Sequence, residues 1–260
     1  MLNVTVIVPL KKLGKTEEKY LNRAIGSLSD NKELNLMFVG PKKVLENAEA
    51  IAKKQAPSIP YELVENNETD IFEQINKAAF ACSSKFFSIL ELDDAYTSNW
   101  LRSAEAFIND NYGKSVYLLF EEIVDKDGAS QYFANEMAWN PAYVGDSLGV
   151  LTEEAVRAYP NFIFSGALIN TEDFIAVHGL KPSMKIAAWY EFALRVLANK
   201  KEIFTIPKIG YLHTVGREDS YDENIRKEIS EEEGRWLVET AVEESRFNDD
   251  RKLKFEKSEE

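Results

Sequence analysis

The chain has 260 residues, 45% of them hydrophobic, and a formal net charge of -13. This size and apolar content exclude a disordered chain and fit one large α/β domain, or a domain with an appendage. The acidic balance argues against a surface that coats nucleic acid, because binding to backbone phosphates depends on clustered Lys and Arg.

The single cysteine, Cys82, excludes an intramolecular disulfide and favours a reducing compartment. The longest apolar runs have the length of a strand and fall far short of the ~20 residues that span a bilayer. We therefore expect a cytoplasmic protein without a membrane span.

The first half of the chain alternates short apolar runs with helical patterns. The β-branched run at residues 3–9 predicts a strand buried on both faces of a sheet. Further strands are expected at 34–39, 61–64 and 86–92, and helices at 21–28, 44–52 and 70–82. This alternation implies a parallel sheet with helices on both faces.

The second half of the chain predicts a mixed sheet. Residues 115–134 indicate two strands around the turn Asp125-Lys126-Asp127-Gly128. A strand is expected at 162–170, a helix at 187–199 and extended chain at 202–212. From Glu223 onward, five apolar residues predict a helix that packs back on the body: Ile225, Ile229, Trp236, Leu237 and Ala241. We divide the chain into a domain at 1–221 and an acidic, partly helical extension at 222–260.

Three acids follow the apolar strand at 86–90. In an open parallel sheet, ligands bind beyond the carboxyl ends of the strands. Glu91 and Asp93 would address the same side of an extended chain, with Asp94 in the following turn. A Mg²⁺ or Mn²⁺ ion that bridges two phosphates would relieve the repulsion among them. Alternatively, Asp93 or Asp94 caps the helix that includes Trp100–Ile108.

The order of several blocks resembles that of family 2 glycosyltransferases with a GT-A fold. The blocks lie at residues 4–9, 21–28, 74–78 and 86–94, followed by 164–169, 177–181 and 189–195. They span roughly residues 3–220 and are similar to those of phage-encoded members. The resemblance implies a nucleotide-diphospho-sugar transferase fold: a mixed, mostly parallel central sheet with helices on both faces, followed here by the acidic helical tail.

The same resemblance implies a metal-dependent, inverting glycosyltransferase. Its donor would be a nucleotide-diphosphate sugar, with a UDP-sugar expected, and its acceptor a hydroxyl of a glycan, a protein or another molecule. Glu91-Leu92-Asp93-Asp94 stands at the Asp-X-Asp motif, which holds the metal, and His213 stands where related enzymes often place a histidine that completes the metal shell. The resemblance therefore implies that Glu91, Asp93 and His213 hold Mn²⁺ or Mg²⁺. Asp93 is the more direct ligand, because Glu91 reaches one methylene further. Glu191 matches the catalytic base, which takes the proton of the acceptor hydroxyl.

The donor site implied by the resemblance draws on several segments. Its expected residues are Pro9, Leu10, Asn67, Gln74, Glu91, Asp93 and Arg217. Asn and Gln amides can pair with the edge of a pyrimidine. Residues 38–42 depart from the family pattern: they contain no Asp, where family members commonly carry an Asp-rich segment that binds the nucleobase.

Two other functions fit parts of the sequence. A sugar nucleotidyltransferase would place a Gly-rich basic loop after the first strand, but residues 10–15 contain a single glycine. A GT-A module without catalysis could serve a structural or binding role in a virion or another assembly, since fold does not imply function. A homo-oligomer stays open, as does the host cytoplasm as the location if the protein is viral.

Overall fold

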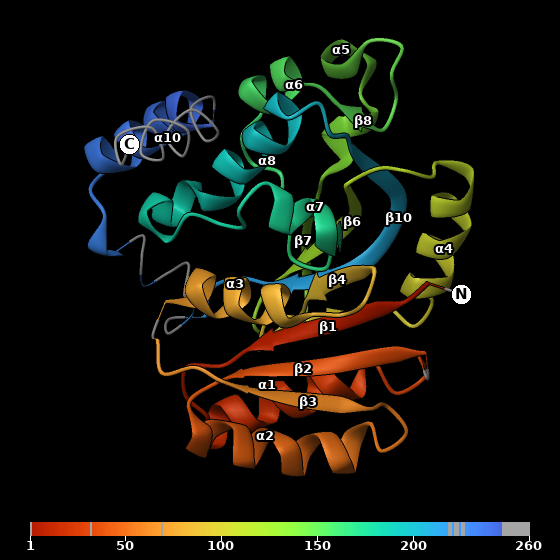
Figure 1. The fold of residues 1–260 in the computed structure, drawn as a ribbon, viewed down its shortest axis with the longest axis vertical. Coiled ribbons are helices and arrows are strands. Elements are labelled where there is room, and N and C mark those ends of the chain that lie inside the picture. The colour runs from red at the N-terminus through yellow and green to blue at the C-terminus, as the bar shows by residue number, and fades with distance from the viewer. Residues whose placement is uncertain are drawn as a thin grey trace, which may run out of the picture.

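The structure is a computed structural model that describes residues 2–31, 33–68, 70–217, 220, 224 and 227–245. Its strands are β1 (Val4–Pro9), β2 (Leu34–Gly40), β3 (Tyr61–Glu65), β4 (Phe86–Ile89), β5 (Ala95–Tyr96), β6 (Val116–Val124), β7 (Ser130–Ala134), β8 (Val150–Leu151), β9 (Leu168–Asn170) and β10 (Ile203–Thr214). Within the described residues these strands form one mixed sheet in the order β3-β2-β1-β4-β9-β6-β10-β5, with β7 beside β6 and β8 beside β10 (Figure 1).

The sheet is parallel in its first half and mixed in its second. Strands β3, β2, β1 and β4 run parallel, as the βαβ pattern predicts. Strand β9 is antiparallel to both β4 and β6, whereas β6 and β10 are parallel. Strands β6 and β7 form the predicted antiparallel hairpin. The expectation of a mixed, mostly parallel sheet is therefore confirmed for the described residues.

Helices cover both faces of the sheet (Figure 1). They are α1 (Lys15–Gly26), α2 (Lys42–Gln55), α3 (Ile71–Ala81), α4 (Trp100–Asp110), α5 (Pro141–Val144), α6 (Glu153–Ala158), α7 (Thr171–Ala176), α8 (Ala188–Ala198) and α10 (Glu231–Glu244), with 3-10 turns η1 (Glu136–Trp139) and η2 (Pro182–Ala187). Helices α1, α2 and α4 contribute to one core, and α3, α7, α8 and α10 contribute to the core on the other face.

Strand β1 is apolar at every position except Thr5, because both of its faces are buried. Val4, Val6 and Val8 point into the core beneath α1 and α2, and Ile7 points into the core beneath α3. Side chains alternate across a pleated strand, so a strand covered on both faces needs apolar residues at successive positions. Strand β1 is paired on both sides, by β2 and β4, as expected for an internal strand.

Two strands are shorter than the sequence indicates. Strand β4 ends at Ile89 rather than at residue 92, and β9 begins at Leu168 rather than at residue 162. Apolar residues that follow β4 and precede β9 are buried without being part of a strand, because a turn or loop can also bury apolar side chains. Helices α6 and α7 have six residues each, too few to show a helical period in the sequence.

The predicted C-terminal helix is present as α10, which packs against α8 and η2. Leu237 and Ala241 are buried, but Trp236 is 59% exposed, so Trp236 lies outside the face that packs on the body. Ile225 and residues 246–260 lie outside the described residues, and the division at residue 221 stays a prediction. None of the described helices is both long and apolar enough to cross a membrane.

Candidate active site

The acidic segment after β4 forms a turn rather than an extended strand. The backbone N–H of Asp94 donates to the carbonyl oxygen of Glu91 at 3.2 Å. A hydrogen bond from residue i+3 to residue i reverses the chain, so the first and fourth residues come together. Glu91 and Asp94 therefore lie side by side, and the expected alternation of Glu91 with Asp93 on an extended chain is wrong.

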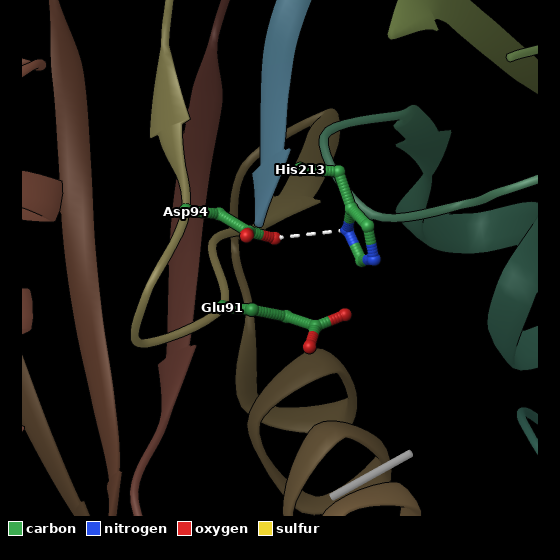
Figure 2. Close-up of side chains that lie close together, drawn as sticks. All are labelled: Glu91, Asp94 and His213. Carbon is green, nitrogen blue, oxygen red and sulfur yellow. Dashed lines mark hydrogen bonds and ion pairs between the residues drawn. The ribbon is translucent and has the colours of Figure 1, made fainter. Parts of the chain in front are cut away.

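The end of β10 supplies the third member of this cluster. Thr214 donates its backbone N–H to Asp94 Oδ1 at 2.7 Å, and His213 Nδ1 lies 3.1 Å from Asp94 Oδ2. Ligand atoms of Glu91, Asp94 and His213 all lie within 4.8 Å of one another. Figure 2 shows the three side chains converging on one space, with the hydrogen bond between Asp94 and His213. The structure thus brings two of the three predicted metal ligands together with Asp94.

Asp93 points elsewhere. Its Oδ2 lies 2.8 Å from Nε of Arg217, and its backbone oxygen accepts hydrogen bonds from Thr214 Oγ1 and from the guanidinium of Arg23. Arg23 also donates to Thr214 Oγ1 at 2.9 Å, so the turn is fixed to both α1 and β10. The metal-ligand role of Asp93 stays a prediction, with Asp94 in the position we expected for it.

The capping alternative does not hold for either aspartate. Helix α4 begins at Trp100 and has Asn99 at its N-cap position. The Asp93 and Asp94 carboxylates instead contact Arg217, His213 and Thr214. Asp94 therefore belongs to the cluster with Glu91 and His213, and Asp93 pairs with Arg217.

Burial and mutual repulsion shift the pKa values of the cluster. Burial, followed by repulsion from Asp94, raises the pKa of Glu91 to about 7, although His213 and the Ser165 hydroxyl act in the opposite sense. Ser165 donates to Glu91 Oε1 at 2.5 Å. Burial lowers the pKa of His213, but the nearby carboxylates, Asp94 first, raise it well above its ordinary value. The cluster is therefore short of positive charge, which a cation would supply.

Glu121 is an acid that the sequence analysis missed. It lies on β6 and is completely buried, and neither of its carboxylate oxygens has a hydrogen-bond partner within the described residues. Burial raises its pKa well above the ordinary value, with smaller effects from His213, Asp94 and Glu91. The sequence does mark this site, because an acidic pair, Glu121 and Glu122, interrupts an otherwise apolar strand. Burial therefore favours the protonated form of Glu121, whose pKa also responds to the charges of the cluster.

A first cavity of about 510 Å³ opens at the ends of β1 and β4. Its lining includes six of the predicted donor residues: Pro9, Leu10, Gln74, Glu91, Asp93 and Arg217. Gln74 is completely buried and donates to the backbone oxygens of Leu10 and Glu68, at 3.2 and 2.9 Å. Its Oε1 has no hydrogen-bond partner in the described part of the chain. Asn67, the seventh predicted residue, is exposed and does not line this cavity.

A second cavity of about 610 Å³ adjoins the first. The two cavities share Ile71, Glu91 and Lys185 among their lining residues, and His213 lines the second. The second cavity is rich in aromatic side chains: Phe72, Tyr132, Tyr159, Phe162, Phe164 and Trp189. Glu91 therefore lies where the two cavities meet.

Glu191, the predicted base, lines neither cavity. Its carboxylate is completely buried and accepts two hydrogen bonds from Arg195, at 2.9 and 2.7 Å. Lys181 Nζ lies 3.0 Å from the same carboxylate, and Arg195 also donates to the backbone oxygens of Val177 and Gly179. This arrangement gives Glu191 a structural ion pair. Its catalytic role stays a prediction that the geometry does not favour.

The fold is similar to that of solved GT-A structures. TarS residues 1–349 from S. aureus, in complex with UDP-GlcNAc, matches with a TM-score of 0.65 and 16% identity, over 95% of this chain and 73% of that chain. The complex of the same fragment with UDP matches with a TM-score of 0.62 and 18% identity, over 91% of this chain and 70% of that chain. The chain has a GT-A fold.

A third similar structure comes from another organism. The mannosyltransferase PcManGT from Pyrobaculum calidifontis, in complex with GDP-Man and Mn²⁺, matches with a TM-score of 0.62 and 17% identity, over 86% of this chain and 60% of that chain. Neither a protein-family model nor a curated protein matches the sequence. Identities this low establish the fold alone.

Proposed function

We propose that the chain is a metal-dependent glycosyltransferase that moves a sugar from a nucleotide-diphosphate donor to an acceptor hydroxyl. The meeting of the two cavities at Glu91, beside Asp94 and His213, carries this proposal. The reacting carbon of a sugar donor must contact both its leaving group and the acceptor. Two adjoining cavities with a charged cluster at their junction meet that requirement. We call the first cavity the donor cavity and the second the acceptor cavity.

The similar structures support the nature of the donor. They hold UDP, UDP-GlcNAc or GDP-Man, and the mannosyltransferase also holds Mn²⁺. In an open α/β sheet, ligands bind beyond the carboxyl ends of the strands, where the donor cavity of this chain lies. We therefore infer a UDP-sugar or a GDP-sugar as donor, with UDP-sugars first to be tested.

The donor set fits a divalent cation. Glu91 and Asp94 offer carboxylate oxygens and His213 offers an imidazole nitrogen. Carboxylates suit both Mg²⁺ and Mn²⁺, and the nitrogen ligand favours the transition metal. A bound Mn²⁺ would offset the charge of the diphosphate. Ser165 holds the Glu91 carboxylate, and the backbone N–H of Thr214 holds that of Asp94, so both ligands are oriented before a cation arrives.

Two residues of the donor cavity could contact different parts of the nucleotide. The Oε1 atom of Gln74 can accept a hydrogen bond from a nucleobase, since its amide nitrogen is already bound to Leu10 and Glu68. Arg217 lines the same cavity and lies against Asp93, where its guanidinium can reach a phosphate oxygen. Gln74 would then set base recognition, and Arg217 would bind the diphosphate.

The acceptor would enter the aromatic cavity and attack the sugar from the side opposite the diphosphate. That direction inverts the anomeric centre. The acceptor oxygen forms the new bond to the anomeric carbon and gives up its proton to water in the cavity, while the bond to the diphosphate oxygen breaks and leaves its electron pair there. Glu191 lines neither cavity and is paired with Arg195, so the geometry does not favour it as the group that receives this proton.

A second candidate function follows from Glu191. Among the described residues that line the acceptor cavity, Glu91 is the one carboxylate. A GT-A module that binds a nucleotide sugar without transferring it would need no separate base. This observation keeps a binding or structural role as the alternative to an enzyme.

A binding and turnover experiment separates these functions. Thermal melting with a panel of UDP-sugars and GDP-sugars, with and without Mn²⁺, should give a rise with one donor that needs the cation, by mass action. Release of UDP or GDP from that donor then reports turnover. Asp94→Asn should abolish the cation effect, and Asp146→Asn, an exposed aspartate outside both cavities, should not. A cation-dependent rise without turnover would favour the binding module, and no rise with any donor would refute both.

A further inference from the structure

Lys185 lies at the junction of the donor and acceptor cavities. It is the one Lys or Arg among the described residues that lines both of them. In the proposed reaction, the bond that breaks joins a sugar at this junction to a diphosphate in the donor cavity. A cation at the junction therefore lies beside the oxygen on which negative charge develops.

The backbone of Lys185 is strained. It adopts φ 45° and ψ -118° inside η2, a conformation that residues other than glycine rarely take. Strain of this kind persists only where the surrounding structure holds the residue, and it concentrates at functional sites. Lys181, four residues earlier, supplies such an anchor, because its Nζ lies 3.0 Å from the buried carboxylate of Glu191. From this strained position Lys185 lines both cavities.

The present partner of Lys185 is easily exchanged. Its Nζ lies 2.9 Å from Oε1 of Glu233 on α10, and the two side chains are 46% and 41% exposed. Ion pairs this exposed contribute little to stability. A diphosphate carries more negative charge than one carboxylate, so it would compete well for the ammonium group.

We propose that Lys185 binds the β-phosphate of the nucleotide donor and stabilises the departing diphosphate, and that Glu233 holds the ammonium group until the phosphate replaces it. This role rests on the proposed function, because it needs a nucleoside diphosphate in the donor cavity. As the bond from the anomeric carbon to the β-phosphate oxygen breaks, its electron pair stays on that oxygen, next to the Lys185 ammonium. Lys185 gives up no proton and forms no covalent bond.

The pair predicts opposite effects of removing each partner. Lys185→Met keeps the length of the side chain and removes its charge, so the Kd for UDP should rise about tenfold in the presence of Mn²⁺. Lys185→Arg should restore most of the affinity. Glu233→Gln removes the competitor and should lower the Kd for UDP. The double variant should bind as weakly as Lys185→Met alone, because Glu233 acts only through Lys185.

Isothermal titration calorimetry with UDP and with inorganic pyrophosphate tests the role. Lys208→Met and Glu239→Gln, exposed residues outside both cavities, are the matched controls and should bind as the wild type does. Thermal melting of each variant shows whether it is folded. The loss in Lys185→Met should appear with both probes, since both carry the diphosphate.

The two levels of failure are distinguishable. If the wild type binds UDP, and Lys185→Met binds both UDP and pyrophosphate as tightly as the wild type does, the role of Lys185 is refuted and the proposed function stands. The same holds if Glu233→Gln weakens binding. If the wild type binds neither UDP nor GDP with Mn²⁺ or Mg²⁺, the proposed function and this role are both refuted.

Discussion

Replacing Glu191 distinguishes a structural carboxylate from a catalytic one. Glu191 and Arg195 are both completely buried, and their two hydrogen bonds are 2.9 and 2.7 Å long. Glu191→Ala would leave the Arg195 guanidinium buried without its counter-ion. Removing one partner of a buried pair costs about 3–5 kcal/mol. For a chain of this size that loss corresponds to a fall in Tm of about 6–20 °C.

Urea unfolding followed by circular dichroism measures this loss, with Glu46→Ala, an exposed acid of helix α2, as the control. The control should change the unfolding free energy by less than about 0.5 kcal/mol. The double variant Glu191→Leu, Arg195→Met should recover much of the stability, because no unpaired charge is left buried. A Glu191→Ala protein that keeps its unfolding free energy and loses donor turnover would refute the structural assignment.

Three further predictions concern the cluster and the donor cavity. The pKa of Glu91 is raised to about 7 and that of His213 is also raised, so Mn²⁺ must displace protons when it binds. The affinity of the protein for Mn²⁺ should therefore rise from about pH 6 to about pH 8, and calorimetry in two buffers should detect the released protons. Gly166→Ala should destabilise the fold by about 1–3 kcal/mol in urea unfolding and weaken Mn²⁺ binding. Gly166 has φ 73°, and its new Cβ would lie 2.5 Å from the Tyr211 ring, whose hydroxyl accepts the backbone N–H of Glu91. Gln74→Leu should raise the Kd for UDP about tenfold and leave that for pyrophosphate unchanged, as titration of both ligands would show.

The raised pKa of Glu91 also makes the stability of the metal-free protein depend on pH. The folded pKa of Glu91 lies above its ordinary value of about 4.5, so folding favours the protonated form. The contribution of Glu91 to stability is therefore complete below about pH 4.5 and is lost as the pH rises toward about 7. Glu91→Gln should flatten this part of the stability profile, and an unchanged profile would contradict the assigned pKa.

The parallel half of the sheet could be predicted because its signals are local. Strand β1 carries an apolar run that only Thr5 interrupts, and helix α3 repeats its apolar residues at helical spacing. Each pattern lies within a dozen residues and reports directly which face is buried. Strand β9 and helices α6 and α7 are too short to leave such a pattern.

The cluster at the sheet edge was predicted in part. The resemblance placed His213 beside Glu91, although 122 positions separate them in the sequence. It could not show which aspartate faces them, because one backbone hydrogen bond, from Asp94 to Glu91, decides that. Glu191 was assigned to catalysis, yet Arg195 four residues later was a local sign of an ion pair on one helix face.

A crystal structure with UDP and Mn²⁺, with anomalous data collected to locate the cation, tests the central claim most directly. We predict Mn²⁺ bound by Glu91, Asp94 and His213, with the uracil beside Gln74 and the β-phosphate beside Lys185. A cation bound elsewhere, or a nucleotide absent from the cavity at the ends of β1 and β4 at saturating concentration, would contradict it.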